Sequence, residues 1–71
     1  MRVEVVAPIT GRVGRIGRQV GDPVGAGDEI LVLESMKVEV PVEASGAGRI
    51  AEIRVGEGES VVEGIVLAVI E

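Results

Sequence analysis

The sequence has no aromatic residue, no cysteine and no histidine among its 71 residues. Because aromatic side chains are missing, the hydrophobic core has to be aliphatic. The absence of cysteine excludes disulfides and thiolate chemistry, and the absence of histidine removes the commonest general base and metal ligand. A chain of this length forms one small domain with little room for a substrate pocket. Together these absences favour a carrier or binding domain over an enzyme.

Positive charge and long apolar segments are also scarce. The formal net charge is −5, and phosphate binding needs a basic surface, so we expect no nucleic-acid partner. The longest apolar run, residues 65–70, is too short to span a bilayer. Residues 1–6 contain an early acid and no long apolar stretch, so they do not resemble a signal peptide. We therefore expect a cytoplasmic protein that does not associate with membranes.

Valine and isoleucine dominate the apolar residues, and glycine is frequent. Hydrophobic residues make up 46% of the chain, and there are 11 glycines and 3 prolines. The stiff β-branched side chains suit a pleated surface better than a helix, and glycine and proline form tight turns. The composition therefore predicts an all-β domain.

The chain repeats one pattern at an offset of 37 residues. Gly11-Arg12-Val13 aligns with Gly48-Arg49-Ile50, and Gly21-Asp22 aligns with Gly58-Glu59. Two copies are too few for a solenoid, so we expect a single domain over residues 1–71 whose halves, about 1–34 and 38–71, cover each other's apolar faces. Four short strand signals in each half predict about eight strands in two small facing sheets.

The segment that joins the halves has the pattern of a hairpin. Val38, Val40 and Val42 alternate with polar residues as in a half-buried strand, which places Met36 and Lys37 near the tip. Two-residue hairpin turns favour positive φ, normally given to glycine or asparagine. A non-glycine pair here departs from local preference, and such departures tend to occur at functional sites.

Lys37 is the only lysine, since the other six of the seven basic residues are arginines. Arginine keeps its charge, whereas a lysine amine can lose its proton and be acylated. The sequence therefore offers one acylable side-chain amine at an exposed turn. An ordinary solvated turn residue is an equally good interpretation of the spacing alone.

Glu34-Ser35-Met36-Lys37 resembles the attachment motif of the biotinyl/lipoyl carrier family, which usually reads Glu-Ala-Met-Lys-Met or Glu-Ser-Met-Lys-Met. Residues 7–11 and 20–28 resemble the opening and the first turn region of the same family, and residues 46–50 and 58–61 resemble the matching parts of its second half. The resemblance therefore covers essentially the whole chain. It implies a flattened eight-stranded barrel-sandwich of two four-stranded antiparallel sheets with pseudo-twofold symmetry. It also implies that the modified lysine lies on the hairpin between the halves.

Within that family the chain is most similar to the biotin carboxyl carriers. The resemblance implies biotin attached covalently to Lys37, with Glu34, Ser35, Met36 and Val38 as residues for ligase recognition and positioning, and with neither a catalytic residue nor a metal site. Met36 before the lysine favours biotin. Val38 stands where biotinyl domains typically have methionine, which leaves lipoate open as the less favoured cofactor.

The resemblance further implies a non-catalytic carrier and names its partners by class. A biotin protein ligase would attach the cofactor, a biotin carboxylase would load it, and a carboxyltransferase would pass the carboxyl group to an acceptor, commonly an acyl-CoA. A carrier has to visit two active sites, so we expect a monomer with transient contacts. A lipoyl carrier of an acyltransferase complex and an unmodified structural adaptor are the remaining alternatives.

Two groups of charged residues are further candidate sites. Arg12, Arg15 and Arg18 could mark a docking surface, but side chains on a strand alternate between faces, so we expect a solvated surface. Glu57, Glu59 and Glu63 surround a turn and could hold a cation, yet calcium sites need a denser ligand set.

Overall fold

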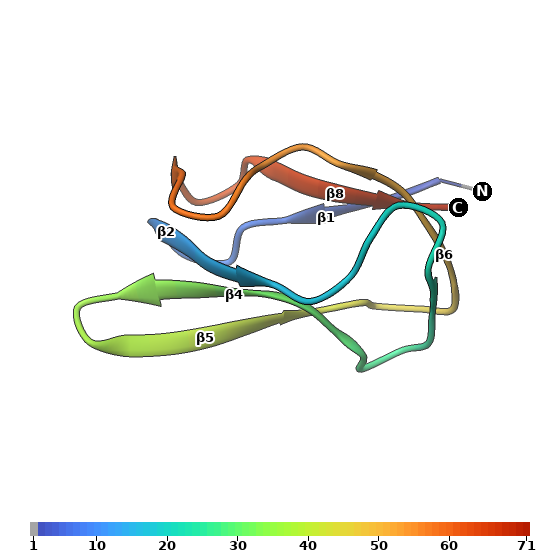
Figure 1. Cartoon of the computed structure of the whole chain (residues 1–71), viewed down its shortest axis with the longest axis horizontal. Helices are drawn as coiled ribbons and strands as arrows, with labels where there is room; N and C mark the ends of the chain where they lie inside the picture. The colour runs from blue at the N-terminus through green and yellow to red at the C-terminus, as the bar shows by residue number, and fades with distance from the viewer. Residues whose placement is uncertain (1) are drawn as a thin grey trace.

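The computed structural model describes residues 2–71, whereas Met1 lies outside the described residues. These residues form two facing antiparallel sheets with the strand orders β1-β8-β6-β3 and β5-β4-β2-β7 (Figure 1). The strands are β1 (Val3–Val6), β2 (Gly11–Ile16), β3 (Pro23–Val24), β4 (Glu29–Ser35), β5 (Val38–Glu43), β6 (Gly48–Ile53), β7 (Ser60–Val61) and β8 (Val66–Ile70). The predicted all-β sandwich is confirmed, and residues 2–71 include no helix that is long and apolar enough to cross a membrane.

The two halves bind each other through equivalent backbone hydrogen bonds. The N–H of Gly27 donates to the carbonyl of Ala44 at 2.8 Å, and the N–H of Gly64 donates to the carbonyl of Ala7 at 2.9 Å. Each glycine is in the left-handed region, with φ of 88° at Gly27 and 91° at Gly64. Since these positions differ by the same offset of 37 found in the sequence, each half uses the same turn to hold the first residues after the other half's edge strand.

The core between the sheets is entirely aliphatic, as the composition predicts. No polar or charged residue among residues 2–71 is buried. The largest fully buried side chains come from both halves: Ile30, Leu31, Leu33, Ile50, Leu67, Val13 and Val69. Burying a side chain of this size stabilises the fold by about 1.5–3 kcal/mol. The halves do not form one face each, as expected from the repeat, because each sheet takes two strands from each half, so this core joins them.

A β-bulge at Gly14 changes which way the β2 side chains face. Arg12 lies opposite Glu34, whereas Arg15 lies opposite Val32, so that Gly14 is the extra residue on β2. Since Glu34 and Val32 are two positions apart on one strand, Arg12 and Arg15 share the outer face of the sheet. The expectation that these arginines alternate between faces is therefore wrong, because the bulge inserts one residue between them.

The β4–β5 hairpin and the chain ends lie at opposite ends of the sandwich (Figure 1). At the end with the termini, Arg2 pairs with Glu71 at 2.5 Å and also with Glu52, which in turn pairs with Arg54 at 2.8 Å. This small network joins the residue before β1, strand β6 and the residue that follows β8, so it links the first and last segments.

The left-handed glycines give a direct test of the turns. Substituting alanine for Gly27 or Gly64 meets no steric clash, since nothing lies within 4 Å of a Cβ built at either position. The backbone conformation alone should lower the free energy of unfolding by about 1–2 kcal/mol. The Gly46→Ala control also has open space but no positive φ, and it should change stability by less than about 0.5 kcal/mol. Urea denaturation measures the free energy of unfolding of all three variants. Equal losses of stability would show that the positive φ has no effect.

The terminal network predicts a pH effect on stability. Hydrogen bonds from Arg54 and then Arg2 hold the pKa of Glu52 below its ordinary value. A carboxylate whose pKa is lower in the folded state stabilises the fold above the unfolded pKa, and this contribution is lost as the pH falls through the folded pKa. The melting temperature of Glu52→Gln should therefore fall less on acidification than that of the unchanged chain. Glu63→Gln is the control, because Glu63 forms no ion pair with any of residues 2–71. Its melting temperature should fall on acidification as much as that of the unchanged chain.

Candidate functional site

The tip of the β4–β5 hairpin is a two-residue turn made of Met36 and Lys37. The strands stay paired as far as Ser35 opposite Val38, and φ is 49° at Met36 and 71° at Lys37. Positive φ at both central residues is what a type I′ turn requires. The predicted tight hairpin is confirmed, and these are the only non-glycine residues with positive φ among residues 2–71.

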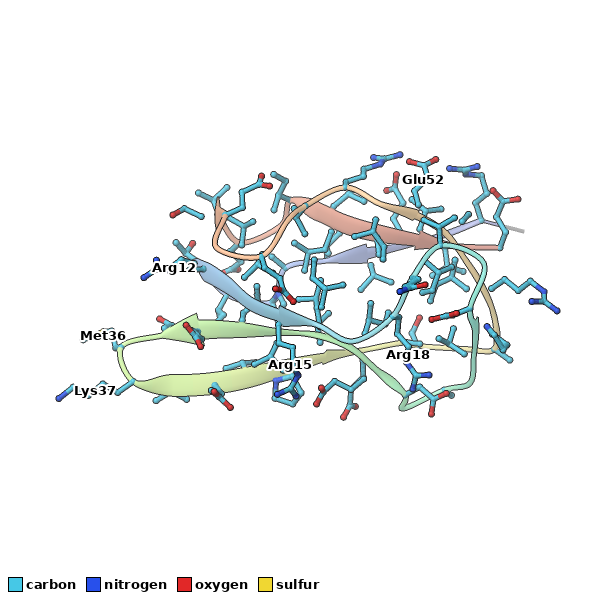
Figure 2. All side chains as sticks on the ribbon, in the orientation of Figure 1. Arg12, Arg15, Arg18, Met36, Lys37 and Glu52 are labelled. Atoms are coloured by element: carbon cyan, nitrogen blue, oxygen red, sulfur yellow. The ribbon has the colours of Figure 1, made fainter. Side chains whose placement is uncertain are left out.

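The side chains at the tip project into solvent. Lys37 is exposed and points away from the sandwich, with Met36 beside it (Figure 2). Met36 is 93% exposed and Val38 is 58% exposed, whereas Val42, on the same side of β5, is 4% exposed. Exposure rises toward the tip because the hairpin extends past the residues of the facing sheet that cover Val42.

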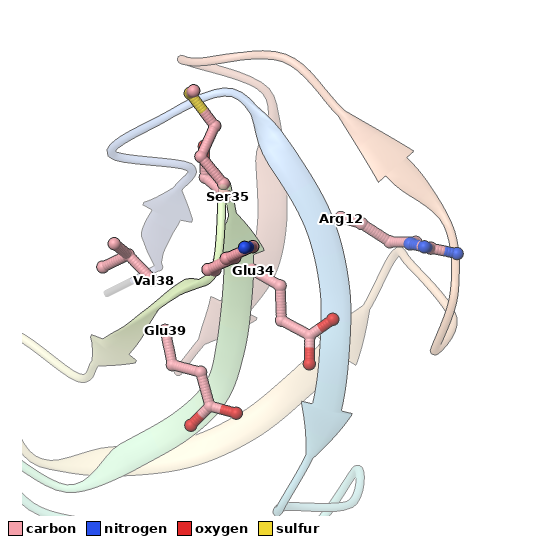
Figure 3. A pocket seen from close by; sticks show the side chains of 7 residues that line it. Arg12, Glu34, Ser35, Val38 and Glu39 are labelled. Atoms are coloured by element: carbon pink, nitrogen blue, oxygen red, sulfur yellow. The ribbon is translucent and has the colours of Figure 1, made fainter.

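The hairpin has two chemically different sides. Glu34 and Glu39 lie directly opposite each other on the outer face, and Arg12 lies opposite Glu34 on the neighbouring strand. Val38 points to the other side, together with its cross-strand partner Ser35 (Figure 3). A shallow hollow at this end is lined by Arg12, Glu34, Ser35, Met36, Lys37, Val38 and Glu39.

Two glycines of β2 lie close to Glu34. A Cβ at Gly11 would be 2.6 Å from the Glu34 carbonyl oxygen, and a Cβ at Gly14 would be 2.9 Å from the Glu34 Cδ. At Gly11 the contact is with backbone, so only glycine lets β2 approach β4 at this point, whereas at Gly14 the exposed Glu34 side chain could shift aside. Gly11 therefore helps to position the backbone of Glu34 beside the tip.

The structure brings all of the residues predicted for the site around one tip. Glu34, Ser35, Met36 and Val38 flank Lys37 directly. Sequence reasoning did not assign Glu39 to the site and set Arg12 aside as a solvated residue. Their place follows from strand register and from the Gly14 bulge, which the hydrophobic pattern alone does not reveal.

Most of the other charged candidates have structural contacts of their own. The carboxylate of Glu57 accepts a hydrogen bond from the N–H of Ile16 at 2.9 Å, and Glu59 accepts one from the N–H of Gly56 at 3.0 Å. Arg15 pairs with Glu29 at 3.1 Å. These carboxylates thus brace turns, and residues 2–71 contain no group of three or more acids that could hold a metal ion.

A small sandwich that presents one lysine at a projecting hairpin tip has the architecture of a carrier domain. The family described as "Biotin-requiring enzyme", the biotinyl/lipoyl family, matches residues 4–70 of the chain. The chain belongs to this family, as the sequence motifs predict. A relative from Mycobacterium leprae, a "Biotinylated protein TB7.3 homolog", is 39% identical over 70 residues, which is 99% of each chain.

Solved structures show the same architecture. Kluyveromyces lactis urea carboxylase matches with a TM-score of 0.94 and 34% identity, over 100% of this chain but 6% of that enzyme. The lipoyl domain of the Azotobacter vinelandii 2-oxoglutarate dehydrogenase complex matches with a TM-score of 0.74 and 32% identity, over 87% of this chain and 78% of that domain. These likenesses confirm the barrel-sandwich fold that the resemblance implied.

The strained turn predicts a gain in stability when Lys37 is replaced by glycine. A positive φ is unfavourable for a residue with a Cβ, so Lys37→Gly should be more stable than Lys37→Ala by about 1 kcal/mol. Both variants lose the amine, which makes the pair a matched comparison of φ alone. Urea denaturation provides the measurement, and equal stabilities would show that the turn carries no such strain.

Proposed function

We propose that the protein is a biotin carboxyl carrier and that Lys37 is biotinylated. The observation that carries this proposal is the exposed amine of Lys37 at the tip of a strained turn, directly after Met36. The amine makes no ion pair with any of residues 2–71, so its side chain is free to enter the active site of a modifying enzyme. The site thus suits a covalently attached group.

Attachment is a single acyl transfer. The Lys37 Nζ, deprotonated in the ligase active site, attacks the acyl carbon of a biotinyl-adenylate supplied by a biotin protein ligase. An amide C–N bond forms, the C–O bond to phosphate breaks, AMP leaves with its electron pair, and the nitrogen releases a proton to solvent. When bound, biotin supplies a ureido nitrogen that carries a carboxyl group. Glu34, Ser35, Met36 and Val38 bind and position the hairpin rather than react.

The chain itself then acts as a tether. The lysine side chain lets the hairpin deliver its cofactor to a biotin carboxylase and next to a carboxyltransferase, with an acyl-CoA as the acceptor that the family resemblance implies. Tethering raises the effective concentration at each site without a new contact. We further propose that this non-catalytic carrier works in the cytoplasm as a monomer, because transient contacts let it leave one active site for the next.

Lipoate is the second candidate, since Val38 replaces the methionine that follows the lysine in typical biotinyl domains. The lysine and its exposure serve either cofactor. Met36 favours biotin, and the structural match to a carboxylase is closer than the match to a lipoyl domain, with TM-scores of 0.94 and 0.74. An unmodified adaptor, the third interpretation, would have no use for the exposed amine.

Modification in cells tests the proposal. Co-expression with a biotin protein ligase should give one biotinyl mass increment and capture on streptavidin, and Lys37→Arg should abolish both. Parallel co-expression with a lipoate ligase should leave the mass unchanged. A lipoyl increment would reverse the cofactor assignment, modification of Lys37→Arg would refute the site, and no modification by either ligase would favour the adaptor.

A further inference from the structure

Two glutamates face each other across the hairpin beside Lys37. Glu34 on β4 is in register with Glu39 on β5, and side chains directly opposite in an antiparallel pair have Cβ atoms about 4.5–5.5 Å apart. Like charges at that separation destabilise the hairpin. Neither carboxylate forms an ion pair with any of residues 2–71. Arg12 lies opposite Glu34 on β2, but no basic residue lies opposite Glu39 in the described pairing of the sheet.

The equivalent positions in the other half of the molecule carry opposite charges. At the offset of 37, Glu34 corresponds to Glu71, and Glu39 corresponds to Arg2. There Arg2 and Glu71 form an ion pair at 2.5 Å. Opposite charges therefore fit this position of the sandwich, and the terminal end uses them.

The comparison between the two ends extends to the neighbouring strands, β2 at the hairpin end and β6 at the terminal end. Arg12 lies opposite Glu34, and its equivalent Arg49 exchanges both backbone hydrogen bonds with Glu71, at 2.7 and 2.9 Å. The two rows are thus Arg49–Glu71–Arg2 at the terminal end and Arg12–Glu34–Glu39 at the hairpin end. They differ in charge at one position, which is Glu39.

The surface around this position is open to a partner. Met36 and Val38, on either side of Lys37, are 93% and 58% exposed, and no strand covers the outer face of the hairpin in the described residues. A macromolecule that contacts Lys37 from the outer face thus meets two carboxylates next to exposed apolar groups. Such a face is complementary to a positively charged side chain, above all to a guanidinium, whose fork of donors can bridge two carboxylates.

We propose that Glu39 is a specificity-determining residue of this hairpin, and that together with Glu34 it binds an arginine or lysine of the biotin protein ligase. The inference rests on the proposed function. The ligase is the favoured partner because it has to reach the short, unmodified Lys37 side chain and so must contact the residues beside it. Later partners meet the longer biotinyl tether and can act farther from the outer face.

The test separates recognition from stability. In Glu39→Arg the new arginine faces Glu34, as Arg2 faces Glu71, so we expect the melting temperature to rise by about 2–4 °C. The kcat/KM for biotinylation by purified ligase with biotin and ATP should nevertheless fall by about a hundredfold, and that of Glu39→Gln by about tenfold, because a charge pair becomes a repulsion or is lost. The unchanged chain should also be modified more slowly as salt increases.

The matched control is the equivalent substitution at the other end. Arg2→Glu creates the same facing pair of glutamates far from Lys37, so its melting temperature should fall while biotinylation proceeds at the unchanged rate. Arg2→Gln serves the same comparison if Arg2→Glu does not fold. The two substitutions should therefore shift the melting temperature in opposite directions, and only the one at Glu39 should slow biotinylation.

Each other result overturns a defined part of the proposal. If Glu39→Arg is biotinylated as fast as the unchanged chain, Glu39 has no role in ligase recognition. If biotinylation is unchanged but loading by a biotin carboxylase falls, the basic partner is the carboxylase and the ligase assignment is wrong. If the unchanged chain is not modified at all, the proposed function fails rather than this inference.

Discussion

The whole structure depends on an aliphatic contact that neither half of the chain can make alone. Each half contributes two strands to each sheet, and the apolar faces of the two sheets bury each other without any aromatic side chain. The turns at Gly27 and Gly64 then donate hydrogen bonds across to Ala44 and Ala7. Because the halves exchange the same contacts, the molecule has two equivalent ends.

The two ends differ in their residues although their backbone architecture is equivalent. One carries the chain termini, held by the Arg2 ion pairs to Glu71 and Glu52. At the other, the chain continues from β4 into β5, and the connection becomes a projecting turn with two strained residues, Met36 and Lys37. Features that would lower stability are therefore concentrated at the end that bears the lysine, as expected where a surface is kept for a partner.

Glycines of β2 help to position the site. Gly11 allows β2 to approach the backbone of β4, and the bulge at Gly14 turns Arg12 and Arg15 to one face. The outer face of the hairpin thereby gains its row of charges, while Met36 and Val38 remain exposed on either side of the lysine. A carrier can work with such a site because the enzymes that it visits supply the chemistry.

The sequence by itself determined the all-β class, the repeat, the hairpin between the halves and the place of the sole lysine, because composition, periodicity and turn residues act locally. The family resemblance added the barrel-sandwich and the attachment motif. Only the tertiary structure decided that Arg12 and Arg15 share a face, that Glu39 stands opposite Glu34, and that Val38 is uncovered while Val42 is buried. Register, bulges and coverage depend on which strands meet, so they follow from packing between distant segments, which no local pattern records.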